Sequence, residues 1–225
     1  MRPYHDIGGS RAGPVKPDKP KDPIFEYSWH KRVLGLTVAS GAMGAWSIDT
    51  LRFRRETLPK EDYQSYTYYE KWLVALNNLF VSRGFVDLEE IENGVYDKIR
   101  QPLNPKTLRA NAVPSMLATG AKASRPSSGT PTLFIGEKVQ TKRPSDTLLQ
   151  SPGHTMLPHY AAGKTGVILF YHGHHVLPNS NAHFLGENPE PLYSVEFSSE
   201  DLWISAEPGD SVIVDCWESY LEPKL

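Results

Sequence analysis

The sequence predicts an α+β fold in which a helical half is followed by a β half. In residues 25–97 apolar side chains recur at spacings of three and four, and after Pro131 short runs of β-forming residues take their place. Residues 98–132, between the two halves, hold no long periodic element and include a Ser/Pro/Gly cluster. We therefore expect an extended N-terminal arm (1–24), a helical domain (25–97), an irregular linker (98–132) and a β-barrel domain (133–225).

The N-terminal arm has a composition that cannot form a core of its own. Gly8-Gly9, Gly13-Pro14, Pro17, Pro20 and Pro23 are spread among scattered lysines and aspartates. Two interpretations stay open: a floppy tail, or an arm that becomes ordered on a partner subunit.

The helical domain begins with two predicted helices. The first is amphipathic, with its apolar residues at Phe25, Trp29, Val33 and Leu36. The second starts at Ser47, whose hydroxyl can cap the backbone N–H groups of the first turn, with Asp49 favourably placed toward the helix dipole. It ends before Pro59, because the residue that precedes a proline is pushed out of the α region.

The third predicted helix carries most of the aromatic residues. It has apolar residues at Tyr66, Tyr69, Leu73, Leu76 and Phe80, with Tyr68 and Trp72 on an adjacent stripe and Arg83-Gly84 at its end. A short helix follows from Asp87, which is spaced from Glu90 like a capping box, to Asn93-Gly94. Another short helix is expected around 112–119.

The second and third helices form the densest feature of the chain. Ile48, Leu51 and Arg55 share one face of the second helix, and Arg52 stands on the flank of that face. Helical spacing alone favours an ordinary interpretation, in which Arg52 is a solvated arginine and the aromatic stripe is core.

The C-terminal half shows four clear β runs, at 133–142, 166–172, 192–198 and 211–217. Tyr193, Val195 and Phe197 alternate with Leu192, Ser194 and Glu196, as in a strand with one buried face. A single capped helical turn is expected at 199–203. Four or five strands in roughly ninety residues suggest a small, strongly bent barrel, and we expect an SH3-like one.

Composition excludes several classes of protein. The 225 residues are 39% hydrophobic, enough for a core, and the net charge of −2 gives no electrostatic reason to expect nucleic acid or an anionic membrane as partner. The single cysteine, Cys216, is expected to be buried and excludes an intramolecular disulfide. Neither a membrane span nor the apolar core of a signal peptide is present, so we expect a cytoplasmic protein.

One histidine cluster is a candidate metal site. His172 and His174 could face one side of a strand, with Glu187 as a carboxylate ligand. The alternative is that histidines at a strand end are simply exposed, and we predict that this chain binds no metal of its own. The sequence also lacks a Gly-rich phosphate loop after a strand, a G-x-S-x-G elbow and a Cys-x-x-Cys pair.

Short motifs in a fixed order connect the chain to a known family. They are HDIGG at 5–9, the helix entry at 25–29, the Leu51-Arg52 pair, YYEKW at 68–72, PGHT at 152–155, PHYAAGKTG at 158–166, LGENPEPLYSVEFSSEDLW at 185–203 and VDCWESYLE at 214–222. Over essentially its whole length the chain resembles the β subunit of nitrile hydratase.

The resemblance implies an enzyme of two different subunits, a hydro-lyase assembled as αβ or α2β2 that adds water to a nitrile to give an amide. In that family a low-spin Co(III) or Fe(III) ion is held entirely by the partner α subunit, where two cysteine ligands are oxidised. This chain would then hold no cofactor, and its partners would be the α subunit and a small nitrile.

The resemblance also implies roles for particular residues. Arg52 would clamp the anionic oxygens of the partner's oxidised cysteines, since a guanidinium is always charged and forked. Tyr68 would reach the substrate as a hydroxyl donor and acceptor. The apolar pocket would be lined by Ile48, Leu51, Tyr69 and Trp72.

The sequence departs from the family pattern after the PGHT motif. Members of the family usually carry arginine where this chain has Met156, and often a basic residue where it has Ala162. A second arginine clamp is therefore absent, or another side chain such as His159 or Lys164 supplies it.

Two alternatives stand beside nitrile hydration. One is a subunit similar to those of thiocyanate hydrolase, which shares the metal centre of this family. The other is a non-catalytic assembly protein, because metal-delivery activators resemble the N-terminal half of the subunit. The complete β half argues against the second alternative, and the unbroken β chain argues against the first.

Overall fold

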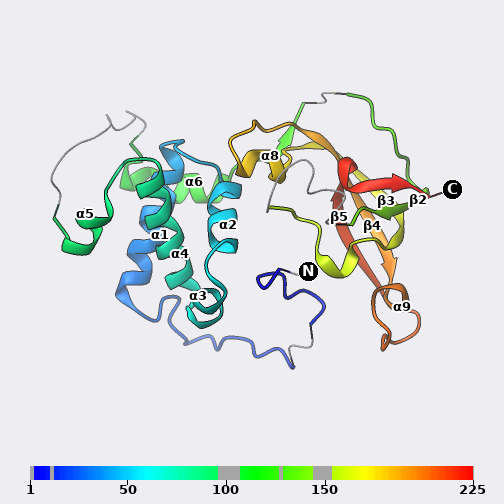
Figure 1. Ribbon diagram of the computed structural model, residues 1–225, viewed down its shortest axis with the longest axis horizontal. Helices are drawn as coiled ribbons and strands as arrows, with labels where there is room; N and C mark the ends of the chain where they lie inside the picture. Colours follow the sequence, from blue (N-terminus) through cyan, green and yellow to red (C-terminus); the bar gives the residue numbers. More distant parts are fainter. Residues whose placement is uncertain (1–2, 11–12, 96–106, 127–128, 144–153, 225) are drawn as a thin grey trace. The chain divides into compact units, whose positions relative to one another are not determined.

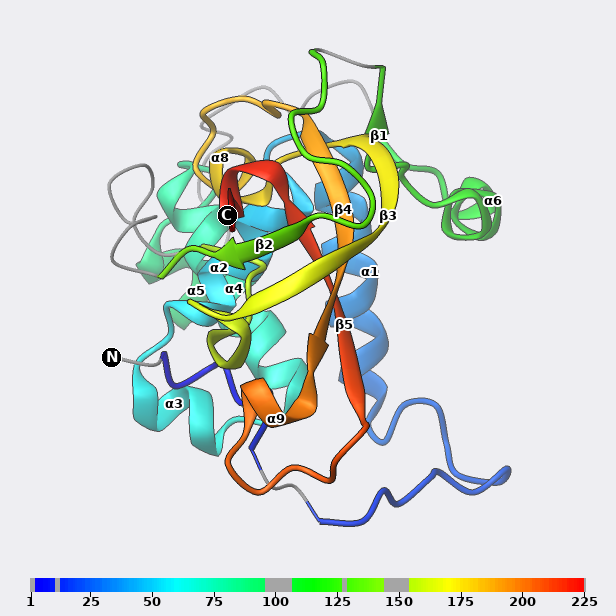
Figure 2. The same cartoon turned by 90° about the vertical axis from the view of Figure 1, so that its right-hand side faces the viewer.

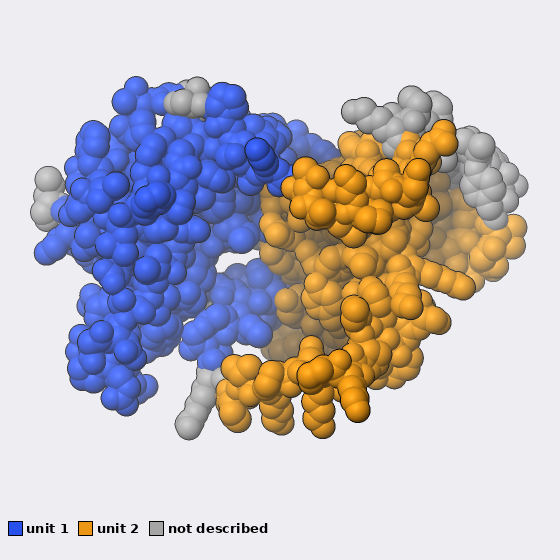
Figure 3. All heavy atoms as spheres, turned by 180° about the vertical axis from the view of Figure 1, so that it is seen from behind, with its two compact units in different colours: residues 1–10, 121–225 blue, residues 11–120 orange. Residues whose placement is uncertain are grey.

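The computed structural model describes residues 3–10, 13–95, 107–126, 129–143 and 154–224. The chain divides into two compact units, one formed by residues 11–120 and the other by residues 1–10 with 121–225 (Figure 1; Figure 3). We call them the helical unit and the β unit. Within the described ranges, no helix combines the length and the apolar character that crossing a membrane requires.

The helical unit contains the helices predicted from periodicity and capping residues, but Phe25 lies before the first of them and the short helix at 60–65 was not predicted. Its elements are α1 (Ser28–Ala42), α2 (Ile48–Glu56), α3 (Lys60–Ser65), α4 (Tyr68–Ser82), α5 (Leu88–Asn93), the 3-10 turn η1 (Ala110–Ala112) and α6 (Val113–Thr119). Ser47 caps α2 as predicted, because its Oγ accepts the backbone N–H of Thr50 at 3.1 Å. The capping box of Asp87 and Glu90 starts α5, and Gly94 ends it in the left-handed conformation.

The start of α4 corrects the prediction that its helix includes Tyr66. Tyr66 follows α3 in an extended conformation, and Thr67 is the N-cap of α4. The Glu70 carboxylate accepts both the backbone N–H and the hydroxyl of Thr67 at 2.7 Å, which forms a capping box that hydrophobic periodicity did not reveal. The side chains of α4 that are buried are consequently Ala75, Leu76 and Leu79.

The contact between α2 and α4 forms the core of the helical unit. Its buried members are Trp46, Leu51, Ala75, Leu76 and Leu79. Leu76 and Leu79 are fully buried, and each such leucine contributes roughly 2 kcal/mol of hydrophobic stabilisation. Ala75 has no side chain beyond Cβ, so α2 and α4 can approach closely at that position. The ring of Phe80 lies edge to face against Trp46, with centroids 5.3 Å apart.

The β unit is an antiparallel sheet with short helical turns in its connections (Figure 2). The strands are β1 (Ser124–Arg125), β2 (Lys138–Thr141), β3 (Thr165–His175), β4 (Glu190–Ser198), β5 (Ser211–Trp217) and β6 (Leu221–Pro223). The turns are η2 (His159–Ala161), α8 (Pro178–Ala182), α9 (Ser199–Leu202) and η3 (Glu218–Tyr220). Residues 144–153, which include Pro152 and Gly153 of the PGHT motif, lie outside the described residues.

The strand order is β5-β4-β3-β2-β6, with β1 added to β3. Although only η3 separates β5 from β6 along the chain, these two strands lie at opposite ends of the hydrogen-bonded order. Among the described residues no ladder joins them, so the sheet is not closed. The predicted α+β class is thus confirmed, whereas the strand pairing does not form the closed barrel that was expected.

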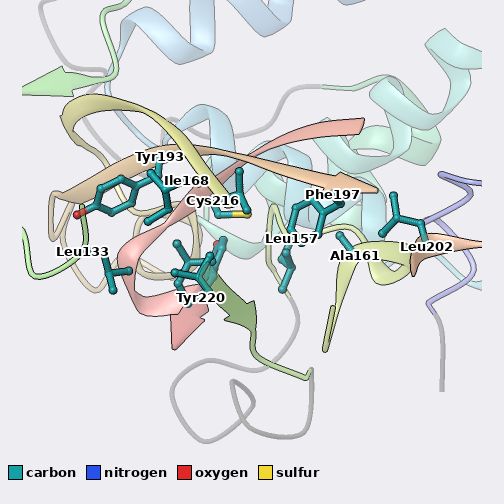
Figure 4. Packing of buried hydrophobic residues seen from close by; sticks show 12 residues of the cluster. Leu133, Leu157, Ala161, Ile168, Tyr193, Phe197, Leu202, Cys216 and Tyr220 are labelled. Carbon is teal, nitrogen blue, oxygen red and sulfur yellow. The ribbon is translucent and has the colours of Figure 1, made fainter. Parts of the chain in front are cut away.

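The core of the β unit follows the alternation predicted for β4. Tyr193, Val195 and Phe197 are fully buried, together with Ile168 of β3 and Cys216 of β5 (Figure 4). Leu192 was expected on the other face but is also buried. Burial raises the pKa of the Cys216 thiol to about 12, so Cys216 is a core residue and stays a protonated thiol at neutral pH.

Residues 3–10 belong to the β unit, where their two adjacent glycines are required by space. The Asp6 carboxylate accepts the backbone N–H of His159 at 2.7 Å. A Cβ added at Gly8 would lie 3.0 Å from the ring of Tyr160, and one at Gly9 would lie 2.9 Å from Nε1 of Trp203. The HDIGG motif therefore brings the backbone into direct contact with two aromatic rings of the C-terminal half.

Gly166, at the beginning of β3, provides a test of the packing of β3 against β4. A Cβ at this position would lie 2.6 Å from the carbonyl oxygen of Glu196 and 2.7 Å from Cγ1 of Val195. We expect Gly166→Ala to lower the free energy of unfolding by about 2 kcal/mol, because neither neighbour can move without shifting β4. Urea unfolding followed by circular dichroism measures it, with Gly129→Ala, where the Cβ would meet nothing within 4 Å, as the control. Equal midpoints for the two variants would contradict the packing described.

Candidate functional site

Helices α2 and α4 bring the predicted site residues of the helical unit onto two packed elements. Helix α2 supplies Ile48, Leu51 and Arg52, and helix α4 supplies Tyr68, Tyr69 and Trp72. The two helices have the most extensive contact within this unit. The spacing of the residues on each helix is local, but the side-by-side placement results from the shared core.

The aromatic residues of α4 form a partly exposed cluster at the start of that helix. Tyr68 is 62% exposed, and its ring centroid lies 5.3 Å from that of Trp72. Tyr69 meets the ring of Tyr68 edge to face at 5.3 Å and stacks on His30 of α1 at 4.5 Å. Tyr68 is therefore the member whose hydroxyl is open to a ligand, whereas Tyr69 ties the cluster to α1.

The apolar pocket residues of α2 lie in different environments. Leu51 is 5% exposed and belongs to the core shared with α4. Ile48, one turn earlier, is 64% exposed. Within this chain, Leu51 packs in the core between the two helices, whereas Ile48 forms an exposed apolar surface.

Arg52 is oriented by an acidic residue of its own helix. Its Nη1 lies 3.2 Å from Oδ1 of Asp49, which is buried, while the Arg52 side chain is 41% exposed. Asp49 occupies one of the five N–H donors of the guanidinium. The exposed remainder of the fork can donate to an anion.

Arg55 is the residue to which the sequence analysis gave no role. Its guanidinium carbon lies 4.8 Å from the ring centroid of Trp72, a cation–π contact between α2 and α4. Burial lowers the pKa of Arg55, and the charge of Arg52 acts in the same direction. The signal was present in the sequence, since Arg55 follows Leu51 by one helical turn and so lies on the face that packs on α4.

The histidines of β3, the candidate metal site of the sequence, do not come together. A register shift between Tyr171 and His174 and a positive φ at Gly173 break the alternation of the strand, so that His172 is exposed and His174 is buried. His172 Nε2 lies 2.7 Å from the hydroxyl of Ser194, and His174 Nδ1 lies 3.2 Å from the hydroxyl of Tyr171.

Glu187, the proposed carboxylate ligand, has a different partner as well. Both of its oxygens accept from the guanidinium of Arg125 at 2.6 Å, and this bond holds the pKa of Glu187 below its ordinary value. Within the described part of the chain there is no group of three or more His, Cys, Asp or Glu side chains that could hold a metal ion.

The region of the missing second arginine lies in the β unit. Met156 is 42% exposed. The ammonium of Lys164 donates to the carbonyl of Asp201, so this side chain is already engaged within the unit. His159 has a buried Nδ1 without a hydrogen-bond partner among the described residues.

Comparisons with known proteins cover both halves of the chain. A family described as "Nitrile hydratase beta subunit, N-terminal" matches residues 1–116, and one described as "Nitrile hydratase beta subunit, C-terminal" matches residues 122–223. The low-molecular weight cobalt-containing nitrile hydratase subunit beta of Rhodococcus rhodochrous is 32% identical over 97% of this chain and 98% of its own length. The nitrile hydratase subunit beta of Pseudomonas putida is 32% identical over 99% and 100%, respectively.

Two further similarities complete the comparison. The cobalt-containing nitrile hydratase subunit beta of Pseudonocardia thermophila is 31% identical over 99% of this chain and 96% of its own length. Among solved structures, the recombinant apo-enzyme of thiocyanate hydrolase from Thiobacillus thioparus superposes on 43% of this chain and 78% of its own chain, with a TM-score of 0.38 and 26% identity.

Proposed function

The chain belongs to the nitrile hydratase β-subunit family, and we propose that with an α subunit it hydrates nitriles to amides. In this hydro-lyase reaction the oxygen of water bonds to the nitrile carbon and becomes the carbonyl oxygen of the amide. Both C–N π bonds are lost, the first on addition of water and the second as the imidic acid becomes the amide, and the two protons of water end on the nitrogen as NH2. No atom is lost and no external oxidant or reductant is required. The observation that carries the proposal is that family similarity spans both halves of the chain.

The metal belongs to the proposed partner. A Co(III) or Fe(III) ion in the α subunit would supply Lewis-acid activation, and the names of two relatives favour cobalt. This chain would contribute positioning groups and pocket walls. That division agrees with its single, buried Cys216, whose thiol is not available as a thiolate ligand.

Arg52 is proposed as the positioning residue for the partner's oxidised cysteine ligands. Its partial exposure leaves guanidinium donors open, and Asp49 fixes the orientation of the fork from one side. An oxyanion at a buried interface needs aimed donors, and a planar fork supplies two at once. Such a contact would hold the ligands in place without touching the substrate.

Tyr68 and Trp72 are proposed to handle the substrate. The Tyr68 side chain is exposed, so its hydroxyl would donate to a nitrile nitrogen or accept from water, while the Trp72 ring would offer a flat apolar wall. Ile48, Leu51 and Tyr69 would complete or support that wall. A nitrile is small and linear, so a few aromatic and aliphatic surfaces suffice to orient it.

The proposed α subunit also explains the exposed N-terminal segment. Residues 13–24 are exposed throughout and contain no helix or strand. We propose that they lie on the partner in an αβ or α2β2 assembly, whose interface would bury roughly 2,000 Å² or more, as permanent hetero-complexes do. We further propose that the β unit is an SH3-like barrel left partly open between β5 and β6.

The proposed function is tested by co-expressing the chain with a nitrile hydratase α subunit in medium containing cobalt. We expect a stable complex that converts a small aliphatic nitrile to its amide, measured by chromatography, and no activity from either subunit alone. A metal-loaded complex that leaves nitriles unchanged but hydrolyses thiocyanate would replace the proposal with the alternative function. A complex inert toward both would support an assembly role.

Arg52→Lys tests the positioning role of the guanidinium. Lysine keeps the charge but not the fork, so we expect kcat to fall about 10-fold or more, as for the loss of one charge-assisted hydrogen bond, with little change in KM. Steady-state kinetics and the absorption band of the metal–thiolate centre measure the effect. The exposed Lys60→Arg is the control, and full activity in Arg52→Lys would remove the proposed role.

Tyr68→Phe separates the role of the Tyr68 hydroxyl from that of its ring. The ring contact with Trp72 is kept and only the hydroxyl is removed, so the complex should assemble with an unchanged melting temperature. We expect kcat/KM for a small nitrile to fall about 10-fold, because one hydrogen bond to a reacting group is lost. Unchanged kinetics would show that the hydroxyl does not contact the substrate.

A further inference from the structure

The positive charge of Arg55 is not paired with a carboxylate in the described part of the chain. Arg52, on the same helix, has its ion pair with Asp49, whereas the contact that holds Arg55 is the face of Trp72. Glu56, the next residue along α2, attracts the Arg55 charge less strongly than burial opposes that charge, and adjacent residues of a helix do not face each other. Arg55 is therefore held by an aromatic ring, and its charge has no ion-pair partner among the described residues.

Two buried donors on touching side chains lack acceptors. Nε of Arg55 and Nε1 of Trp72 are both buried, and neither has a hydrogen-bond partner among the described residues. A buried donor left unsatisfied costs about 1–3 kcal/mol, more when it is charged. Two such donors within one contact indicate that a ligand with hydrogen-bond acceptor atoms binds beside Arg55 and Trp72.

The same place adjoins the proposed substrate pocket. Trp72 contacts Arg55 through its ring and also lies 5.3 Å, centroid to centroid, from the exposed Tyr68. Coulombic attraction from Tyr68 opposes the fall in the pKa of Arg55 that burial causes, so the two side chains are near each other. Any small molecule that binds against Tyr68 and Trp72 is consequently close to the positive charge of Arg55.

We propose that Arg55 is a specificity-determining residue that makes this site prefer nitriles bearing a negatively charged group, in particular a carboxylate. The inference rests on the proposed function, since it places the nitrile against Tyr68 and Trp72. A forked guanidinium pairs with a carboxylate through two parallel hydrogen bonds, and the contact with the Trp72 ring holds the guanidinium beside the proposed pocket. A neutral aliphatic nitrile offers no charged acceptor to these donors.

The test compares two substrates that differ in charge and hardly at all in shape. The α-containing complex is assayed on 3-cyanopropanoate and on 3-cyanopropanamide. We expect Arg55→Gln to raise KM for the carboxylate on the order of 10-fold, as for the loss of one charged hydrogen bond, and to change KM for the amide less than about two-fold. The value of kcat should stay the same for both. Added salt should raise KM for the carboxylate in the native complex.

Arg54→Gln is the matched control. Arg54 is the neighbouring arginine and also has a buried Nε without a described hydrogen-bond partner, yet it makes no ring contact in the described part of the chain. The same charge is removed one position away, so an equal loss of selectivity in this variant would overturn the inference. Arg55→Lys keeps the charge but not the fork, so it should retain only part of the preference, less than the native complex and more than Arg55→Gln.

The remaining outcomes separate the two proposals. A native complex that hydrates the amide substrate but shows no effect of Arg55→Gln on the carboxylate overturns this inference alone. An equal rise of KM for both substrates in Arg55→Gln and Arg55→Lys, with a lower melting temperature, shows a merely structural arginine and also overturns it. A metal-loaded native complex inactive on both substrates removes the proposed function itself.

Discussion

The packing of α2 on α4 is the contact on which the candidate site depends. Leu51 is buried against Leu76 and its neighbours, and this burial fixes the rotation of α2 about its own axis. Once that rotation is set, Arg52 emerges on the flank and Arg55 lies over the aromatic end of α4. The hydrophobic core therefore decides the side of α2 from which each charged group projects, and the contact of Arg52 with Asp49 then orients that guanidinium.

The two arginines illustrate how environment gives different work to one side-chain type. Arg52 has a buried carboxylate as partner and a partly exposed fork, which suits a fixed donor to an oxyanion at an interface. Arg55 rests on the face of Trp72, where the ring stabilises the cation without neutralising it. A charge held this way is available to a substrate. Charge balance, more than sequence position, separates the positioning role proposed for Arg52 from the specificity role proposed for Arg55.

Local rules explain how much could be predicted from the sequence. Ser47 and the Asp87–Glu90 pair set helix starts because capping needs only residues three positions apart. The alternation of Tyr193, Val195 and Phe197 fixed the buried face of β4 because the side-chain period of a strand is two. The start of α4 was misplaced, since the apolar period continued back through Tyr66 although the backbone there is extended.

The sequence by itself determined the α+β class, most helices and strands, the family resemblance and the candidate pair of Arg52 and Tyr68. Only the tertiary structure decided that Arg55 stacks on Trp72, that the bulge at Gly173 sends the neighbouring histidines to opposite faces, and that the sheet stays open. Periodicity and capping are properties of a few consecutive residues. Burial, ring contacts and sheet closure depend on residues distant in the chain, whose approach is set by packing.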